Sequence, residues 1–187
     1  MHPKPQPEPR PRRSGVLLLA ALLVVAALLW TGRAELPAQL ARWTGAATRP
    51  TATLDYARLS PSLDAAALGR QLGGLSLPCQ PQAEGSVCEA ALAEANGVAA
   101  ALLRARWHQG TLQSVDLLLP WWEHHRAVGM LTERLGAPGG NEVVTADGQR
   151  LAALRWSLPE GTVQMARAPG WNPLHWATVR WDAAPPR

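Results

Sequence analysis

The hydrophobic pattern of this 187-residue chain contains one continuous apolar run near its start. Residues 16–30 read VLLLAALLVVAALLW, with Gly15 before the run and Thr31-Gly32 after it. A helix rises about 1.5 Å per residue, so the stretch 15–32 extends for about 27 Å, nearly the thickness of a bilayer core. The pattern therefore predicts that residues 15–33 form a transmembrane helix in the lipid bilayer.

The residues before this helix predict its orientation. Proline occupies every second position from Pro3 to Pro11, which excludes a helix, because proline lacks an amide donor and fixes its own φ. Four basic residues also precede the apolar run, and such flanks stay on the cytoplasmic side. Residues 1–14 are thus expected to be a disordered cytoplasmic tail, and everything after the helix to be exported. A cleaved signal peptide is the alternative, with Gly32-Arg33-Ala34 as a weak cleavage site.

Linker composition follows the predicted helix, and a folded domain follows the linker. Residues 34–53 hold little to bury and are expected to form the linker, the domain to cover 54–182, and 183–187 to be a disordered end. Ser60-Pro61-Ser62 predicts a helix start that Gly73-Gly74 ends. Residues 89–95 are ambiguous, because their alanines favour a helix whereas Asn96-Gly97 favours a hairpin turn.

From residue 98 onward the pattern mostly alternates with a period of two, as in half-buried strands. Strands are expected within 98–108 and over 111–119, 142–145, 150–158, 162–168 and 174–181. Between them, residues 121–135 predict a helix with Trp121, Val128, Leu131 and Leu135 on one face. The predicted fold class is α+β: a transmembrane helix and then a small exported domain, whose antiparallel sheet packs on one or two helices.

The pI of the sequence is near 10, but the basic residues responsible for it are unevenly distributed along the chain. Residues 1–33 carry five basic side chains and one acidic side chain, so residues 34–187 carry thirteen of each and no net charge. The excess positive charge therefore lies beside the predicted membrane helix, where it favours a cytoplasmic N-terminus. A nucleic-acid partner is not expected. The seventeen arginines against one lysine fit the codon bias of a GC-rich bacterium, which makes the periplasm the expected compartment.

Two cysteines, Cys79 and Cys88, lie in the part expected to be exported. An even count in an oxidising compartment predicts that they form a disulfide around an exposed, polar loop. Their spacing is not that of a CxxC redox site, and no histidines at matching spacing suggest zinc.

Candidates for catalysis are weak. Glu123, His124 and His125 are consecutive, so on a helix their side chains diverge, and they are expected to be solvent-exposed polar residues. His175 and a pairing of Asp116 with Glu123 complete the candidates, and nothing in the sequence brings them together. No GxSxG, P-loop or GxGxxG motif occurs. The chain is therefore predicted not to be an enzyme, and no cofactor or metal is expected.

Tryptophan is the unusual residue, with nine copies against one tyrosine and no phenylalanine. Tryptophan is a large core residue, and it is also enriched at interfaces and stacks on sugars. The functional hypothesis is a contact surface in the last third of the chain, formed by Trp156, Trp171, Trp176 and Trp181.

These patterns together favour a protein that binds. The leading hypothesis is a single-pass component of a bacterial inner-membrane complex, which uses a periplasmic domain to bind an envelope protein. The alternative is a periplasmic module that binds a glycan or lipid through its C-terminal tryptophans.

Retention of the anchor is directly testable. We expect protein extracted from the membrane fraction to have the intact mass of the whole chain, 20.1 kDa, because the apolar run is long and ends in a bulky tryptophan. Mass spectrometry checks this. Loss of about the first 34 residues would identify a cleaved signal peptide instead.

Overall fold

The computed structural model describes residues 48–185, except for 147–148 and 170–175, and gives no side-chain placement for 141–151. The predicted tail, the predicted membrane span and most of the predicted linker lie outside these residues. Over the described part of the chain, no helix is long and apolar enough to cross a membrane.

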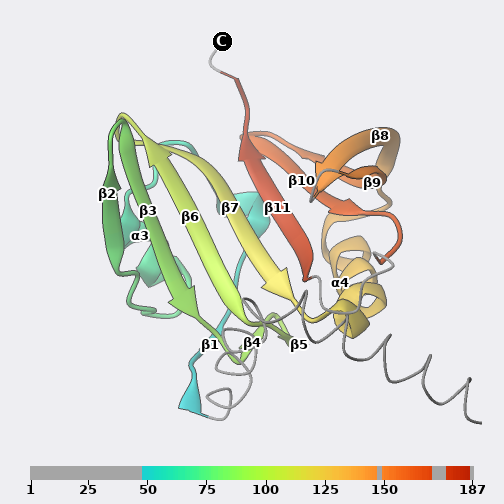
Figure 1. Cartoon of the computed structure of the whole chain (residues 1–187), viewed down its shortest axis with the longest axis horizontal. Coiled ribbons are helices and arrows are strands. Elements are labelled where there is room, and N and C mark those ends of the chain that lie inside the picture. The colour runs from blue at the N-terminus through green and yellow to red at the C-terminus, as the bar shows by residue number, and fades with distance from the viewer. Residues whose placement is uncertain (1–47, 147–148, 170–175, 186–187) are drawn as a thin grey trace, which may run out of the picture. The chain divides into compact units, whose positions relative to one another are not determined.

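Antiparallel pairing dominates the domain, as predicted. Eight strands form one sheet in the order β2-β3-β6-β7-β11-β10-β9-β8 (Figure 1), and three short ones form a second sheet in the order β1-β4-β5. The strands of the large sheet are β2 (Cys79–Gln82), β3 (Gly85–Ala91), β6 (Leu102–His108), β7 (Thr111–Leu119), β8 (Gly139–Ala146), β9 (Gln149–Leu158), β10 (Gly161–Ala166) and β11 (Ala177–Ala183). Those of the small sheet are β1 (Thr51–Ala52), β4 (Glu94–Ala95) and β5 (Val98–Ala99).

Two helices, α3 (Ala65–Gln71) and α4 (His124–Leu135), contribute to one hydrophobic core with the large sheet. The 3-10 turns η2 (Tyr56–Arg58) and η3 (Trp121–Glu123) precede them. Leu68 comes from the first helix, Leu72 is the C-cap of that helix, and Leu131 comes from the second helix; all three are fully buried. The predicted α+β class with a sheet packed on two helices is thus confirmed for the described domain.

Strand register explains how the core forms. Two rows of core residues run across the sheet, and in each row every residue is the direct partner of the next. Because successive side chains of a strand point to opposite faces, the residues between these rows face away from the helices. One row is Cys88, Ala105, Val115, Trp181, Val163 and Trp156, and the other is Ala90, Leu103, Leu117, Val179, Met165 and Leu154.

Several element boundaries differ from the prediction. The first helix begins at Ala65 with Asp64 as its N-cap, whose carboxylate accepts the amide proton of Ala67, so Ser60-Pro61-Ser62 is not a helix start. The alanines of 89–91 lie in β3, since pairing with β6 outweighs their helix propensity. Thr51 and Ala52 form β1 within the folded domain, although the sequence placed them in the linker.

Two hairpin turns follow the local sequence closely. Asn96-Gly97 has φ of 54° and 81°, and Gln109-Gly110 has φ of 50° and 78°. Positive φ at both positions is the geometry of a type I′ turn, which matches the twist of the flanking strands. The asparagine side chain also bonds the backbone of Leu54 through both its oxygen and its nitrogen, which fixes the small sheet to the chain entering the domain.

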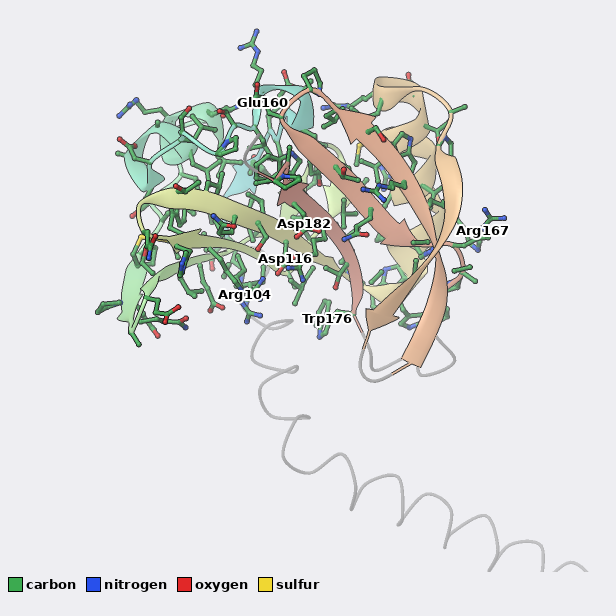
Figure 2. All side chains as sticks on the ribbon, turned by 90° about the horizontal axis from the view of Figure 1, so that it is seen from above. Arg104, Asp116, Glu160, Arg167, Trp176 and Asp182 are labelled. Carbon is green, nitrogen blue, oxygen red and sulfur yellow. A yellow bond between two sulfur atoms is a disulfide. The ribbon has the colours of Figure 1, made fainter. Side chains whose placement is uncertain are left out.

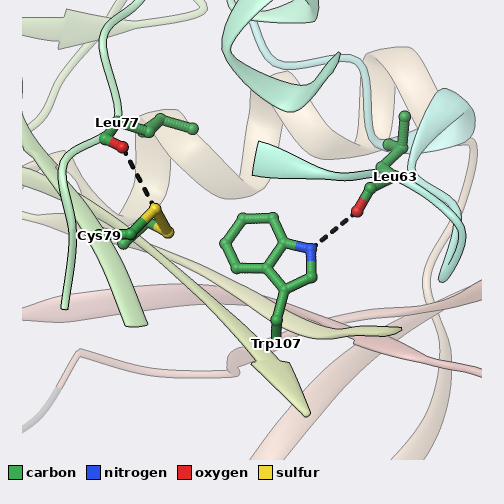
Figure 3. The surroundings of a disulfide bond; sticks show 5 residues. Leu63, Leu77, Cys79 and Trp107 are labelled. Atoms are coloured by element: carbon green, nitrogen blue, oxygen red, sulfur yellow. Dashed lines mark hydrogen bonds between the residues drawn. A yellow bond between two sulfur atoms is a disulfide. The ribbon is translucent and has the colours of Figure 1, made fainter. Parts of the chain in front are cut away.

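The two cysteines are paired as predicted, although the segment between them has a different structure from the predicted loop. The Cys79 and Cys88 sulfur atoms lie 1.96 Å apart, at disulfide distance (Figure 3). The segment between them is a hairpin of β2 and β3 instead of an open loop, and the two cysteines are direct cross-strand partners. In the chain-entropy model, closing a loop of this length contributes about 2–3 kcal/mol. The bridge therefore holds the edge strand β2 to the sheet.

Close packing at Gly161 gives a test of the fold. A Cβ at this position would lie 2.4 Å from the carbonyl oxygen of Asp182 and 2.6 Å from Nε1 of Trp181. Gly161→Ala should lower the free energy of unfolding by about 1–3 kcal/mol, because neither neighbour can move without disturbing the sheet. Gly129→Ala, where nothing lies within 4 Å, should raise it by about 1 kcal/mol. Urea denaturation of both variants measures this, and equal shifts would contradict the packing.

Candidate functional site on the open face of the sheet

The face of the large sheet that points away from the helices carries a row of charged and polar side chains. The row crosses six strands, and each member is the register partner of the next. We call this row together with its neighbours Arg106, Ser114 and Asp182 the open face. Figure 2 shows Arg104, Asp116 and Trp176 on this side of the sheet. The row is Glu89, Arg104, Asp116, Arg180, Gln164 and Arg155.

Ion pairs and hydrogen bonds join these side chains into a network. Arg104 pairs with Glu89, and Arg106 pairs with Asp116. Arg180 lies between two carboxylates, with its Nε 2.7 Å from Oδ1 of Asp182 and 3.7 Å from Oδ1 of Asp116. The amide of Gln164 donates to the other oxygen of Asp182 at 2.6 Å. Opposite charges on adjacent strands stabilise a sheet, so the network fixes the geometry of this face.

Asp116 is the centre of the network. It is only 5% exposed although it lies on the open face, because arginine side chains surround it. Its Oδ1 atom has no hydrogen-bond donor among the described residues. Burial by itself lowers the pKa of Arg180, but its hydrogen bond to Asp182 and the charges of Asp182 and Asp116 outweigh burial and raise this pKa. The arginine therefore stays charged and oriented.

A shallow groove of about 500 Å³ adjoins this face at the end of β3. Its lining includes Gly73, Gly74 and Leu75 on one side and Glu89, Ala90 and Ala91 on the other. Glu89 is the titratable side chain of this lining and already pairs with Arg104.

The tryptophans lie differently from the prediction. Trp156 is 2% exposed and Trp181 is fully buried, because both occupy the core row that faces the helices. They belong to the core and not to a contact surface. Trp171 lies outside the described residues, and Trp176 is partly exposed just before β11. Of the four predicted residues, Trp176 is thus the one that the described structure leaves accessible.

Two other tryptophans are the large apolar residues exposed on the described domain. Trp121 is 40% exposed and Trp122 is 47% exposed, and their rings meet edge to face with centroids 6.1 Å apart. Trp121 was expected on the buried face of the second helix. It lies instead in the 3-10 turn η3, whose three-residue period moves it off that face. The proline before the pair was the sequence signal for this break.

The histidines also require a correction. His124 was expected to be exposed but is 1% exposed, and its Nε2 lies 2.7 Å from the carbonyl oxygen of Ala166. Because a carbonyl only accepts, Nε2 carries a proton, and Nδ1 is left buried with no hydrogen-bond partner among the described residues. His125 is exposed as expected. Burial lowers the pKa of His124, although the bond to Ala166 opposes the shift and the charge of His125 adds to it.

The catalytic candidates are not assembled into one site in the described structure. Asp116 lies on β7 in the arginine network, whereas Glu123 lies at the start of the helix and pairs with Arg126. His175 lies outside the described residues. Within the residues that could be searched, no three His, Cys, Asp or Glu side chains come together as a metal site requires.

Comparison with known proteins adds no identity. No family model, no curated protein and no solved structure matches the chain. The open face must therefore be interpreted from its own residues, and what they offer is recognition: fixed, alternating charges with four arginines whose forks can bind carboxylates.

The buried His124 predicts a pH dependence of stability. Its pKa is lowered in the folded protein, so the unfolded chain binds its proton first, and stability should fall as the pH drops below about 6.5. His124→Gln should flatten the fall in melting temperature between pH 7.5 and 5.5, whereas His125→Gln, which removes only the smallest cause of the shift, should change it much less. Thermal denaturation at both pH values measures this, and identical pH profiles for wild type and His124→Gln would refute it.

Proposed function

We propose that this protein is a single-pass component of a bacterial inner-membrane complex that binds an envelope protein through the open face of its periplasmic domain. In this proposal the N-terminus is cytoplasmic, residues 15–33 anchor the chain, and the domain acts by binding without catalysis. The observation that carries the proposal is the arginine-rich ion-pair network across the open face.

The cysteine pair supports the proposed compartment. Disulfides persist in the periplasm and are rare in the cytosol, where thiols are kept reduced. Cys79 and Cys88 lie at disulfide distance on adjacent strands, and the bridge secures an otherwise exposed edge strand. A bridge in this position has a structural purpose only where it stays oxidised, which favours export of the domain.

The chemistry of the open face supports a protein partner. Arginine is enriched at protein interfaces, where its planar fork makes directional bonds to carboxylates. Arg104, Arg155 and Arg180 lie in one row, and the carboxylates of Glu89 and Asp182 hold Arg104 and Arg180 in place. A preordered arginine loses less conformational entropy on binding, so this face suits an acidic or mixed-charge protein surface.

The alternative function, a glycan- or lipid-binding module built on the C-terminal tryptophans, has less support. Two of its four residues are core residues, so they cannot stack on a ligand. Among the described residues of this set, only Trp176 is accessible, and one partly exposed ring does not form the concave, mostly apolar pocket typical of ligand sites.

Site-specific photo-crosslinking in cells tests the proposal. A crosslinker at Ser157, which is exposed two residues after Arg155 on the same side of the sheet, should give a discrete adduct with one envelope protein, whereas one at Ala66, exposed on α3, should not. Arg104→Ala with Arg155→Ala should weaken the adduct, by about 30-fold in affinity if each arginine contributes about 1 kcal/mol to binding.

The matched control is Arg58→Ala with Arg70→Ala, which removes two exposed arginines outside the open face. It should leave the adduct unchanged. An adduct from Ala66 but not Ser157, or equal loss in both double variants, would contradict binding through the open face.

A further inference from the structure

The exposed tryptophan pair lies at a particular end of the sheet. Leu119 is the last residue of β7 and pairs with Ala177, the first residue of β11. Leu118 pairs in the same way with Leu102, the first residue of β6. We call this the Leu119 end of the sheet. Trp121 and Trp122 follow it after a single proline, so the pair projects from this end.

The chain enters the domain at the same end. Thr51 of β1 pairs with Glu94 of β4, and β4 follows shortly after β3 ends at the Leu119 end. The amide of Ala101, just beyond β5, donates to the carbonyl of Leu118. Figure 1 shows β1, β4, β5 and the tip of β7 together along the lower side of the domain. The described chain begins at Thr48, immediately before this entry point.

The open face becomes apolar toward this end. The next row of register partners beyond the charged row consists of Ala91, Leu102, Leu118 and Thr178. Trp176 lies on the same side just before β11 and is partly exposed. Three accessible indoles thus lie at the end of the domain where the chain enters, whereas the charged network lies further along the strands.

The length of the chain before the described residues limits how far this end lies from the predicted anchor. Residues 34–47 separate the predicted anchor from Thr48, and fourteen residues span about 50 Å at most when fully extended. The domain is therefore held within reach of the bilayer surface. An indole ring has an apolar body and one N–H donor, so its preferred place is the headgroup region between water and hydrocarbon.

We propose that Trp121 and Trp122 insert into the headgroup region of the bilayer and hold the Leu119 end of the domain against the membrane. The inference rests on the anchored topology of the proposed function. The strands then meet the membrane end-on, and the charged open face is turned sideways, toward neighbouring proteins of the same membrane.

Fluorescence quenching by lipid tests this with the full-length chain in nanodiscs of phosphatidylcholine and phosphatidylglycerol. Trp30→Phe and Trp43→Phe first remove the two tryptophans that precede the described domain. Lipids brominated near the headgroup should quench part of the remaining emission. Trp121→Phe with Trp122→Phe should abolish most of that quenching, because the pair supplies the rings in contact with lipid.

Trp107→Phe is the matched control, since Trp107 lies near the opposite end of β6 and is nearly buried. It should leave lipid quenching in place. Lipid quenching that is absent, or that is unchanged without the Trp121–Trp122 pair, would overturn the inference.

The intact mass of the reconstituted chain separates this inference from the proposed function. If the anchor is present and lipid quenching is absent, the membrane contact is refuted and the anchoring stands. If the anchor has been removed, the proposed topology itself fails.

Discussion

The alternation of side chains in a pleated sheet is the constraint on which this domain depends. Each strand contributes residues to two faces, and register aligns these residues into rows that cross the sheet. The row from Cys88 to Trp156 builds the core, and the row from Glu89 to Arg155 builds the open face. A one-residue slip of β3, β6, β7, β9 or β11 would place a charged side chain in the core, so the core and the charged face require the same register.

The position of each tryptophan relative to these rows decides whether it is buried or exposed. Trp156 and Trp181 fill the core because they fall on the helix-facing rows. Trp121 and Trp122 follow the strand and precede the helix, where neither periodicity buries them. A domain without phenylalanine thus uses one residue type both as its large core group and as its exposed apolar group.

The proposed binding face and the proposed membrane contact complement each other. The binding face is the side of the sheet that the helices leave uncovered, and the membrane contact is the turn η3, which follows the end of β7. A domain held at one end by its entering chain and by indoles would lose orientational freedom, which lowers the entropic cost of binding a neighbour in the same membrane. The disulfide stabilises the domain, and the buried His124 makes its stability depend on pH. Neither group is part of the two proposed surfaces.

The sequence by itself determined the alternating strands, the hairpin turns at Asn96-Gly97 and Gln109-Gly110 and the α+β class, because periodicity and turn chemistry are local properties. It also pointed to Cys79 and Cys88 through count and spacing. Only the tertiary structure decided that β11 inserts between β7 and β10, which aligns Arg180 with Asp116. It likewise decided which tryptophans and which histidine are buried. Burial and strand order depend on contacts between residues far apart in the chain, and no local pattern encodes them.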